Sequence, residues 1–339
     1  MKELPKQKAF LRPPPPRPRT GSASESCEPR ESPPDISGEG KPRAIPSIYV
    51  QSPDLIVLGY WTLTTLLLLV FWTRIRTPGI YLAIHSGVLL LIGTVLHTCR
   101  PDCGIHIRFL RTFYPWIIVI ASFREIHFLA SQIQPFEGLT WDRRLSALDR
   151  LLFGDVGAAF QNLLWPPLVD LLTICYWSYY FWPIVLCGVL LLRKRNSELR
   201  EFLTILLLNY FLCHLCYYIF PALGPHLVEH AHGIARDTRQ EGLVLGGLSY
   251  RFLLQLELRT PDAFPSGHAL LAMICILTAL RLRVYRFATL LLCSGSLVAT
   301  VYLRYHYLVD VLVAVPLLPL CWYGGRAIHR FWEGRPSPG

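Results

Sequence analysis

About eight stretches of apolar sequence, each close to the length of a membrane span, dominate this chain. A helix needs about 20 residues to cross the hydrocarbon core of a bilayer. Hydrophobic residues make up 52% of the 339 residues and charged residues only 17%, which is typical of a polytopic membrane protein. We therefore predict an all-α helical bundle of about eight spans: Leu55–Trp72, Ile80–Leu96, Tyr114–Ala130, Pro167–Leu192, Phe202–Phe220, Ala269–Leu280, Phe287–Leu303 and Leu308–Tyr323.

Basic residues cluster at the ends of the predicted spans and orient the chain in the membrane. Lysine and arginine gather in short cytoplasmic loops, which places segments 193–200, 281–286 and 326–335 inside. The order of the spans then brings segments 264–268 and 304–310 to the outer face. Five arginines fall on the outer side and count against this topology: Arg74, Arg76, Arg143, Arg144 and Arg150.

The net charge of +10 belongs to these loops and tails. We therefore expect the lipid bilayer, and no nucleic acid, as the partner; the sequence does not identify partner proteins. Because the chain shows no retention signal, we expect a bacterial plasma membrane, with the functional face on the extracytoplasmic side. A eukaryotic internal membrane remains the alternative.

The composition divides the chain into four parts. Residues 1–46 are rich in proline, serine and charge and predict a disordered cytoplasmic tail. Residues 47–140 hold the N-terminal transmembrane helices, residues 141–325 form the domain that carries the candidate chemistry, and residues 326–339 form a second cytoplasmic tail. Within the third part, apolar positions at helical spacing predict an amphipathic interfacial helix that ends at Gly154.

The long polar segment 224–260 separates two predicted spans. Its length exceeds that of a simple turn, and it is rich in histidine and arginine, so it is either a lid or headgroup-binding loop or a solvated connector. The sequence does not choose between these two readings.

His306 and Asp310 form the first candidate catalytic pair. Residues four apart on a helix share a face one turn apart. A carboxylate in that position can accept a hydrogen bond from one imidazole nitrogen, which fixes the tautomer and makes the other nitrogen a better nucleophile. The pair therefore suits covalent catalysis.

A second motif, Pro265-Ser266-Gly267-His268, opens the next candidate span. Ser266 is a suitable N-cap and Gly267 permits close approach, so the free N–H groups of the helix N-terminus would form an anion site. His268 would stand beside the anion as a general acid. The alternative is an ordinary capped span whose histidine reaches the interface.

Together the two motifs supply a nucleophile, its partner, an acid and an anion cradle on one membrane face. This set favours phosphoryl transfer through a phosphohistidine, and because no residue set for Mg²⁺ accompanies it, we expect no metal and no cofactor. Two other classes stay open. In a transporter, His268, His306 and Asp310 would relay protons, although the spans show no inverted repeat. A non-catalytic relative would serve as a lipid-binding scaffold.

The two motifs resemble the second and third signatures of the type 2 phosphatidic acid phosphatase superfamily, which is vanadium haloperoxidase-like. The resemblance implies that His306 is the nucleophile, Asp310 its partner and His268 the acid, with Ser266 and Gly267 at the phosphate. It also implies a helical core with its active site near the outer surface. Softer stretches are similar to the branch that includes inositol phosphorylceramide synthases, which implies a role in sphingolipid metabolism: Asp149–Gly154, Tyr176–Tyr180, Tyr218–Pro225 and Tyr302–Tyr307.

The chain departs from the superfamily pattern at two cationic positions. The first signature, Lys-x6-Arg-Pro, is absent before the Ser-Gly-His motif, and Thr300 stands where the third signature has an arginine. Arg304 would lie on the same face as Thr300 if that stretch were helical, so we expect it to replace the arginine. Arg259 and His226 are weaker candidates for the other phosphate-binding cations.

The sequence thus predicts an integral membrane lipid phosphatase or phosphotransferase that acts on a phosphorylated lipid at the outer face. If water accepts the phosphate group the protein is a phosphatase. If inositol or another alcohol accepts it, the protein is a headgroup transferase of the inositol phosphorylceramide synthase type. The sequence does not identify the lipid or the acceptor.

Overall fold

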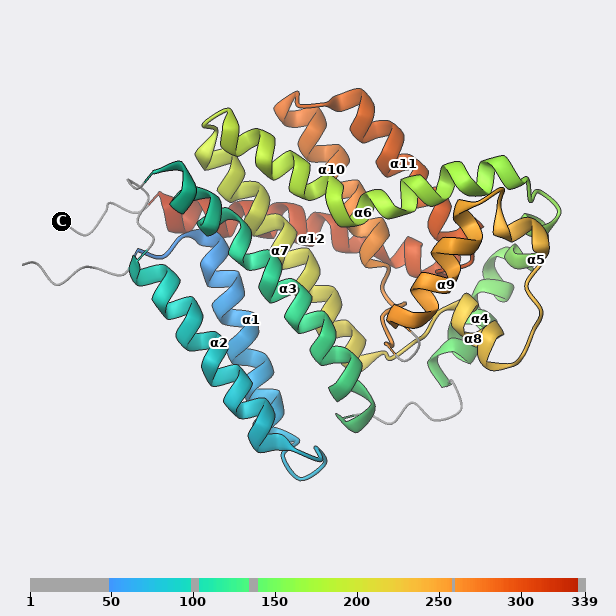
Figure 1. Cartoon of the computed structure of the whole chain (residues 1–339), viewed down its shortest axis with the longest axis horizontal. Coiled ribbons are helices and arrows are strands. Elements are labelled where there is room, and N and C mark those ends of the chain that lie inside the picture. The colour runs from blue at the N-terminus through green and yellow to red at the C-terminus, as the bar shows by residue number, and fades with distance from the viewer. Residues whose placement is uncertain (1–48, 99–103, 134–139, 258–259, 335–339) are drawn as a thin grey trace, which may run out of the picture. The chain divides into compact units, whose positions relative to one another are not determined.

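The computed structural model describes residues 49–98, 104–133, 140–257 and 260–334, and every regular element in these ranges is a helix (Figure 1). The predicted all-α class is therefore confirmed. The predicted disordered tail at 1–46 lies outside the described residues. The helices are α1 Ser52–Val70, α2 Pro78–Thr98, α3 Ile105–Ile133, α4 Thr140–Phe153, α5 Val156–Gln161, α6 Pro166–Leu192, α7 Asn196–Ile219, α8 Pro225–Ala231, the 3₁₀ turn η2 Thr238–Glu241, α9 Leu245–Glu257, α10 Gly267–Leu282, α11 Arg286–Tyr302 and α12 Leu308–Glu333.

Within the described ranges, six helices are long and apolar enough to cross a membrane: α1, α2, α3, α6, α7 and α12. Helices α10 and α11 are also apolar but shorter, with 16 and 17 residues. Each of the predicted apolar stretches corresponds to one of these helices. The chain is an integral membrane protein that crosses the bilayer several times.

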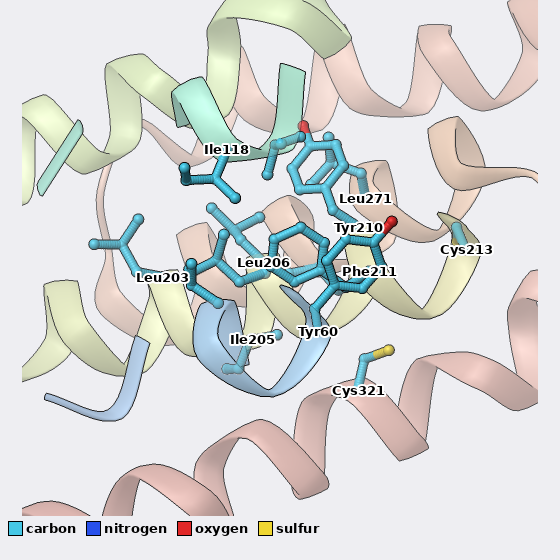
Figure 2. Packing of buried hydrophobic residues seen from close by; sticks show 14 of the residues in the cluster. Tyr60, Ile118, Leu203, Ile205, Leu206, Tyr210, Phe211, Cys213, Leu271 and Cys321 are labelled. Atoms are coloured by element: carbon cyan, nitrogen blue, oxygen red, sulfur yellow. The ribbon is translucent and has the colours of Figure 1, made fainter. Parts of the chain in front are cut away.

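Helix α7 lies at the centre of the bundle and packs against α1, α3, α6, α10 and α12. It is more deeply buried than the other long helices, because these five helices pack around it. Figure 2 shows its residues Leu206, Tyr210 and Phe211 among side chains from α1, α3 and α10. The Tyr60 ring of α1 stacks on Phe211 with 4.1 Å between centroids. The N-terminal helices α1 and α3 and the C-terminal helices α10 and α12 all pack on α7, and they therefore share one hydrophobic core.

Helix α4 confirms the predicted helix at 141–154 and ends at Gly154, whose φ of +73° is favourable for glycine at a helix C-terminus. Its buried positions Asp142, Leu145 and Asp149 recur at helical spacing and form one face. That face packs on the beginning of α12. Two aspartates on a buried face need hydrogen-bond donors, and these donors come from the candidate site.

Candidate active site

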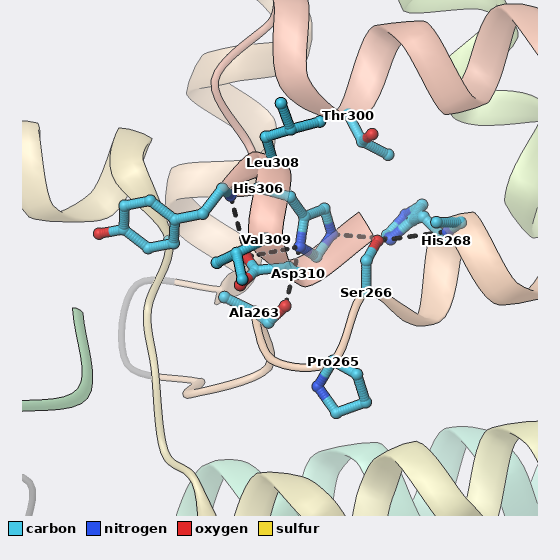
Figure 3. Close-up of polar contacts among 12 residues, drawn as sticks. Ala263, Pro265, Ser266, His268, Thr300, His306, Leu308, Val309 and Asp310 are labelled. Atoms are coloured by element: carbon cyan, nitrogen blue, oxygen red, sulfur yellow. Dashed lines mark hydrogen bonds and ion pairs between the residues drawn. The ribbon is translucent and has the colours of Figure 1, made fainter. Parts of the chain in front are cut away.

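His306 lies in the turn between α11 and α12 (Figure 3). Helix α11 ends at Tyr302, and the next residues reverse direction before α12 begins at Leu308. The N–H groups of Tyr305 and His306 both donate to the carbonyl oxygen of Thr300, at 3.0 and 2.9 Å. These two bonds hold the turn, and the turn places the buried His306 ring against the beginning of α10.

The Nδ1 atom of His306 has one hydrogen-bond acceptor and one carboxylate nearby. The carbonyl oxygen of Ala263 lies 2.9 Å away, and the Asp310 carboxylate lies 3.6 Å away on the same side of the ring. The nearer Asp310 oxygen also accepts a 2.9 Å hydrogen bond from the N–H of Tyr307, and so caps α12. The carbonyl acceptor, together with the negative charge of the nearby carboxylate, favours a proton on Nδ1 and leaves a lone pair on Nε2.

Asp310 therefore lies beside His306 as the spacing predicts, although the shorter contact of the ring is to Ala263. Sequence reasoning missed Ala263 because its contribution is a backbone carbonyl, for which the side-chain pattern carries no signal. The neighbouring Asp262 is half-buried near His306, and burial raises its pKa to about 7.

His268 stands at the start of α10 and meets His306 across the site. Ser266 caps this helix, its hydroxyl accepting from the N–H of Ala269 at 3.2 Å. The Nδ1 atom of His268 lies 3.5 Å from Nε2 of His306, and the ring centroids are 5.5 Å apart. The structure thus brings together two imidazoles that are 38 residues apart in the sequence.

Aromatic residues of α6 hold the His268 ring in place. Tyr179 and Tyr176 stack on it, with centroid distances of 3.8 and 4.5 Å, and Tyr180 meets it edge-on at 6.0 Å. Stacking of this kind fixes the orientation of a ring at low entropic cost. The Tyr176–Tyr180 stretch therefore contributes to the candidate site by positioning His268.

Gly267 permits a close approach, but the group that approaches is a side chain. A Cβ atom at this position would lie 3.0 Å from the Tyr217 hydroxyl of α7. The N–H of Ser266 donates to the carbonyl oxygen of Asp310 at 3.2 Å. Ser266 and Gly267 thus join α7, α10 and α12 at the site, and their role at a phosphate stays a prediction.

A pocket of about 80 Å³ opens beside His306. Two cations line it, Arg304 from the turn before His306 and Arg150 from α4, together with Asp149 and Tyr307. The Arg304 side chain forms an ion pair with Glu229 of α8. Sequence reasoning did not single out Arg150 for the site, although it directly follows Asp149 in a stretch that resembles the family.

The predicted position of Arg304, on the same helical face as Thr300, is wrong. Helix α11 ends at Tyr302, and Arg304 has a left-handed φ of +64°, so Thr300 and Arg304 do not share a helical face. Thr300 is fully buried and its hydroxyl donates to the carbonyl oxygen of Leu297 at 2.7 Å. Arg304 lines the pocket because it lies in the turn that follows α11 and not in the helix itself.

Two other cations were expected at the site, Arg259 and His226. Arg259 lies outside the described residues. His226 of α8 is buried against Tyr305, with ring centroids 4.9 Å apart, and burial lowers its pKa to about 3. Burial therefore favours the neutral imidazole, and the cationic role expected for His226 stays a prediction.

The buried aspartates of α4 bind the backbone around the site. Asp149 accepts from the N–H groups of Leu308 and Val309 at 3.0 and 2.8 Å, at the first residues of α12. Asp142 accepts from the N–H groups of Leu223 and Gly224 at 3.1 and 2.9 Å.

The Tyr307 hydroxyl also donates to Asp142, at 3.2 Å. Burial raises the pKa of Asp142, and its backbone donors oppose that shift. In the sequence, the signal for Asp142 and Asp149 was their spacing: two aspartates seven residues apart on the apolar side of an amphipathic helix.

A membrane-spanning helical bundle that brings these two histidine motifs together defines the class of membrane phosphatase-like proteins. Comparison with known families agrees with this class. The sequence model of the PAP2 superfamily matches residues 143–323, more than half of the chain. The chain belongs to the PAP2 superfamily.

One curated relative is a PA-phosphatase related-family protein of Dictyostelium discoideum. It is 29% identical over 132 residues, which are 38% of this chain and 24% of the relative. The match thus spans about a quarter of the relative's length. No solved structure shows a significant match to the chain. The similarity to the inositol phosphorylceramide synthase branch stays a prediction.

Proposed function

We propose that the protein is a lipid phosphatase or phosphotransferase that acts through a phosphohistidine at His306. The observation that carries this proposal is the geometry of the two rings. Nδ1 of His306 contacts the Ala263 carbonyl, so Nε2 is left to react, and Nε2 faces the Nδ1 atom of His268 at 3.5 Å. A nucleophile with an oriented tautomer next to a general acid is the arrangement that this reaction needs.

The reaction has two steps. In the first, Nε2 of His306 attacks phosphorus, the bond from phosphorus to the lipid oxygen breaks, and protonated His268 gives its proton to that oxygen. In the second, water or an alcohol attacks the phosphohistidine, the nitrogen–phosphorus bond breaks, and His268 recovers the proton. Water gives a phosphatase. An alcohol such as inositol gives a headgroup transferase.

Substrate binding must separate the two rings. Phosphorus sits about 3–3.5 Å from an attacking atom before reaction, and a leaving oxygen sits about 3 Å from its acid. The nitrogens of His306 and His268 must then be roughly 5 Å or more apart, whereas they lie at 3.5 Å. The pocket beside His306 provides space for phosphate oxygens, and Arg150 and Arg304 provide positive charge there.

We also propose that this pocket faces away from the cytoplasm, because the arginine-rich loops predict that the opposite ends of the spans lie inside. The bacterial plasma membrane stays a prediction from the sequence. Protease protection of tags inserted at the 193–195 turn and in the exposed 232–235 segment, measured in membrane vesicles, would test the orientation. Equal protection on both sides would contradict it.

The decisive experiment measures phosphate release from phosphatidic acid and related lipids by purified wild type, His306→Ala and Asp310→Asn. We expect release by the wild type in the presence of EDTA, loss of about 10³-fold or more with His306→Ala, and a smaller loss with Asp310→Asn, because the Ala263 carbonyl still holds Nδ1. Rapid quenching with labelled lipid should trap an acid-labile phosphoprotein in the wild type and none in His306→Ala.

Two outcomes would contradict the proposal. A wild type that is silent against a broad lipid panel would favour the lipid-binding scaffold. Label that persists in His306→Ala would reject His306 as the nucleophile. Adding inositol during turnover distinguishes the acceptors, since a transferase converts it to a phosphorylated product and a phosphatase does not.

A further inference from the structure

A second cationic cavity lies at the other end of the bundle from the catalytic histidines. Its volume is about 60 Å³, and it is bounded by the first turns of α3 and α7, the residue that precedes α1, and the last turn of α6. Its polar lining comes from Gln51, Arg108, Arg111, Thr112, Asn196 and Arg200. Three arginines thus surround one small cavity.

Among the described residues, two of the three arginines of this cavity form ion pairs with carboxylates and the third does not. The Arg111 guanidinium lies 2.5 Å from the Asp54 carboxylate, and Arg200 lies 3.1 Å from Glu333. Arg108 forms no ion pair with the residues that the structure describes, and its buried Nε atom has no hydrogen-bond partner among them. A buried guanidinium N–H without an acceptor is costly. The cavity therefore has one more cation than it has carboxylates.

Two helix N-termini add to this positive charge. Arg108 and Arg111 project from the first two turns of α3, and Asn196 is the first residue of α7. The residue that precedes α7 makes no side-chain capping hydrogen bond. The beginning of a helix carries unsatisfied N–H groups and the positive end of its dipole, both of which favour an anion.

We propose that this cavity, which we call the Arg108 site, binds a phosphate group, carried as a monoester by an anionic lipid headgroup or free in solution as inorganic phosphate. Arginine guanidinium groups form paired hydrogen bonds with phosphate oxygens. Basic pockets between transmembrane helices bind anionic headgroups in this way. A phosphate would give the Arg108 Nε an acceptor and balance the excess charge.

The Arg108 site is separate from the catalytic pocket. Helix α7 begins at the cavity with Asn196, and near its other end Tyr217 donates a 3.4 Å hydrogen bond to the carbonyl oxygen of Pro265. The 20 residues between them span about 30 Å at the rise of an α-helix. The two sites therefore lie at opposite ends of one helix, and the Arg108 site does not depend on the catalytic chemistry of His306.

The test uses the full chain in detergent with His306→Ala in the background, so that the probe lipid is not consumed. Isothermal titration calorimetry measures the dissociation constants of dioctanoyl phosphatidic acid and of inorganic phosphate. Arg108→Gln removes the uncompensated charge. Arg124→Gln is the matched control, because Arg124 is exposed on the same helix, about four turns away. Asn196→Asp is a second variant that adds a negative charge to the cavity wall.

We expect Arg108→Gln and Asn196→Asp to weaken binding by about tenfold or more, the loss of one charge-assisted hydrogen bond, and Arg124→Gln to leave it unchanged. Binding of phosphatidic acid alone would identify a lipid headgroup as the ligand. Comparable binding of both probes would identify phosphate itself. The proposal is overturned if no Arg108-dependent binding of either probe is measured, or if Arg124→Gln weakens binding as much as Arg108→Gln does.

Discussion

Asp149 offers the sharpest test of how the site is held together. Its carboxylate is 8% exposed and accepts two backbone N–H groups at the start of α12, at 3.0 and 2.8 Å. Replacement by alanine leaves both donors without this acceptor, in a place that water reaches poorly. The loss of an N-cap costs about 1–2 kcal/mol, and a hydrogen bond to a charged group contributes about 1.5–3 kcal/mol.

We therefore expect Asp149→Ala to lower the free energy of unfolding by about 2–4 kcal/mol. Asp149→Asn keeps an acceptor oxygen and should cost about half as much. Phosphate release should fall more steeply than stability, because the first turn of α12 carries Asp310 and follows directly on His306. A misplacement of about 1 Å near the reacting atoms can cost about 100-fold in rate.

Unfolding in mixed micelles, followed by circular dichroism at 222 nm, measures the stability, and phosphate release measures the activity. Asp237→Ala is the control: Asp237 also accepts a backbone N–H, at 2.8 Å, but it caps the exposed turn η2. We expect the control to lose less than about 1 kcal/mol and no activity. If Asp149→Ala matched the control in both assays, the idea that α4 holds the site through α12 would be wrong.

Three further predictions concern other parts of the bundle. Burial raises the pKa of Asp262 to about 7, so its contribution to stability is complete below about pH 4 and is lost as the pH rises through 7. Asp262→Asn should remove this decline, which is at most about 1.4 kcal/mol per pH unit, in unfolding measured from pH 4 to 8. Tyr179→Leu removes a ring stacked on His268 and should lower kcat about tenfold with little change in KM; an equal change in both would contradict the positioning role. His85→Ala breaks a buried 2.5 Å contact with Glu125 and should cost about 3 kcal/mol in unfolding, while the kcat of the folded fraction is unchanged.

The helices were predictable because their signal is local. An apolar stretch of bilayer length can satisfy its backbone groups in lipid only as a helix or in a closed barrel, and each predicted span corresponds to a helix. The meeting of His268 and His306 was predictable for a different reason. Each motif sits at the beginning or end of an apolar stretch, and the loop charges placed both on one face of the membrane.

The hydrogen bonds of the site were not predictable from side-chain patterns. The partner of His306 Nδ1 is the backbone carbonyl of Ala263, and the N–H groups that Asp149 binds are also backbone atoms. Their positions depend on how α4, α10 and α12 pack. The predicted shared helical face of Thr300 and Arg304 was wrong because α11 ends two residues before Arg304, and helix boundaries are where sequence signals are weakest.

Thr300 stands where the third superfamily signature has an arginine. This difference agrees with a site whose positive charge comes from other residues that line the pocket. Thr300 is fully buried, its hydroxyl bonds the Leu297 carbonyl, and its own carbonyl oxygen accepts from the N–H groups of Tyr305 and His306. An arginine there would need room and a carboxylate or phosphate partner inside the bundle. Arg304 and Arg150 instead line the pocket beside His306, from the turn and from α4. The position of Arg150 depends on the packing of α4 against α12. Asp149 holds these two helices together, and so it links the position of Arg150 to that of His306.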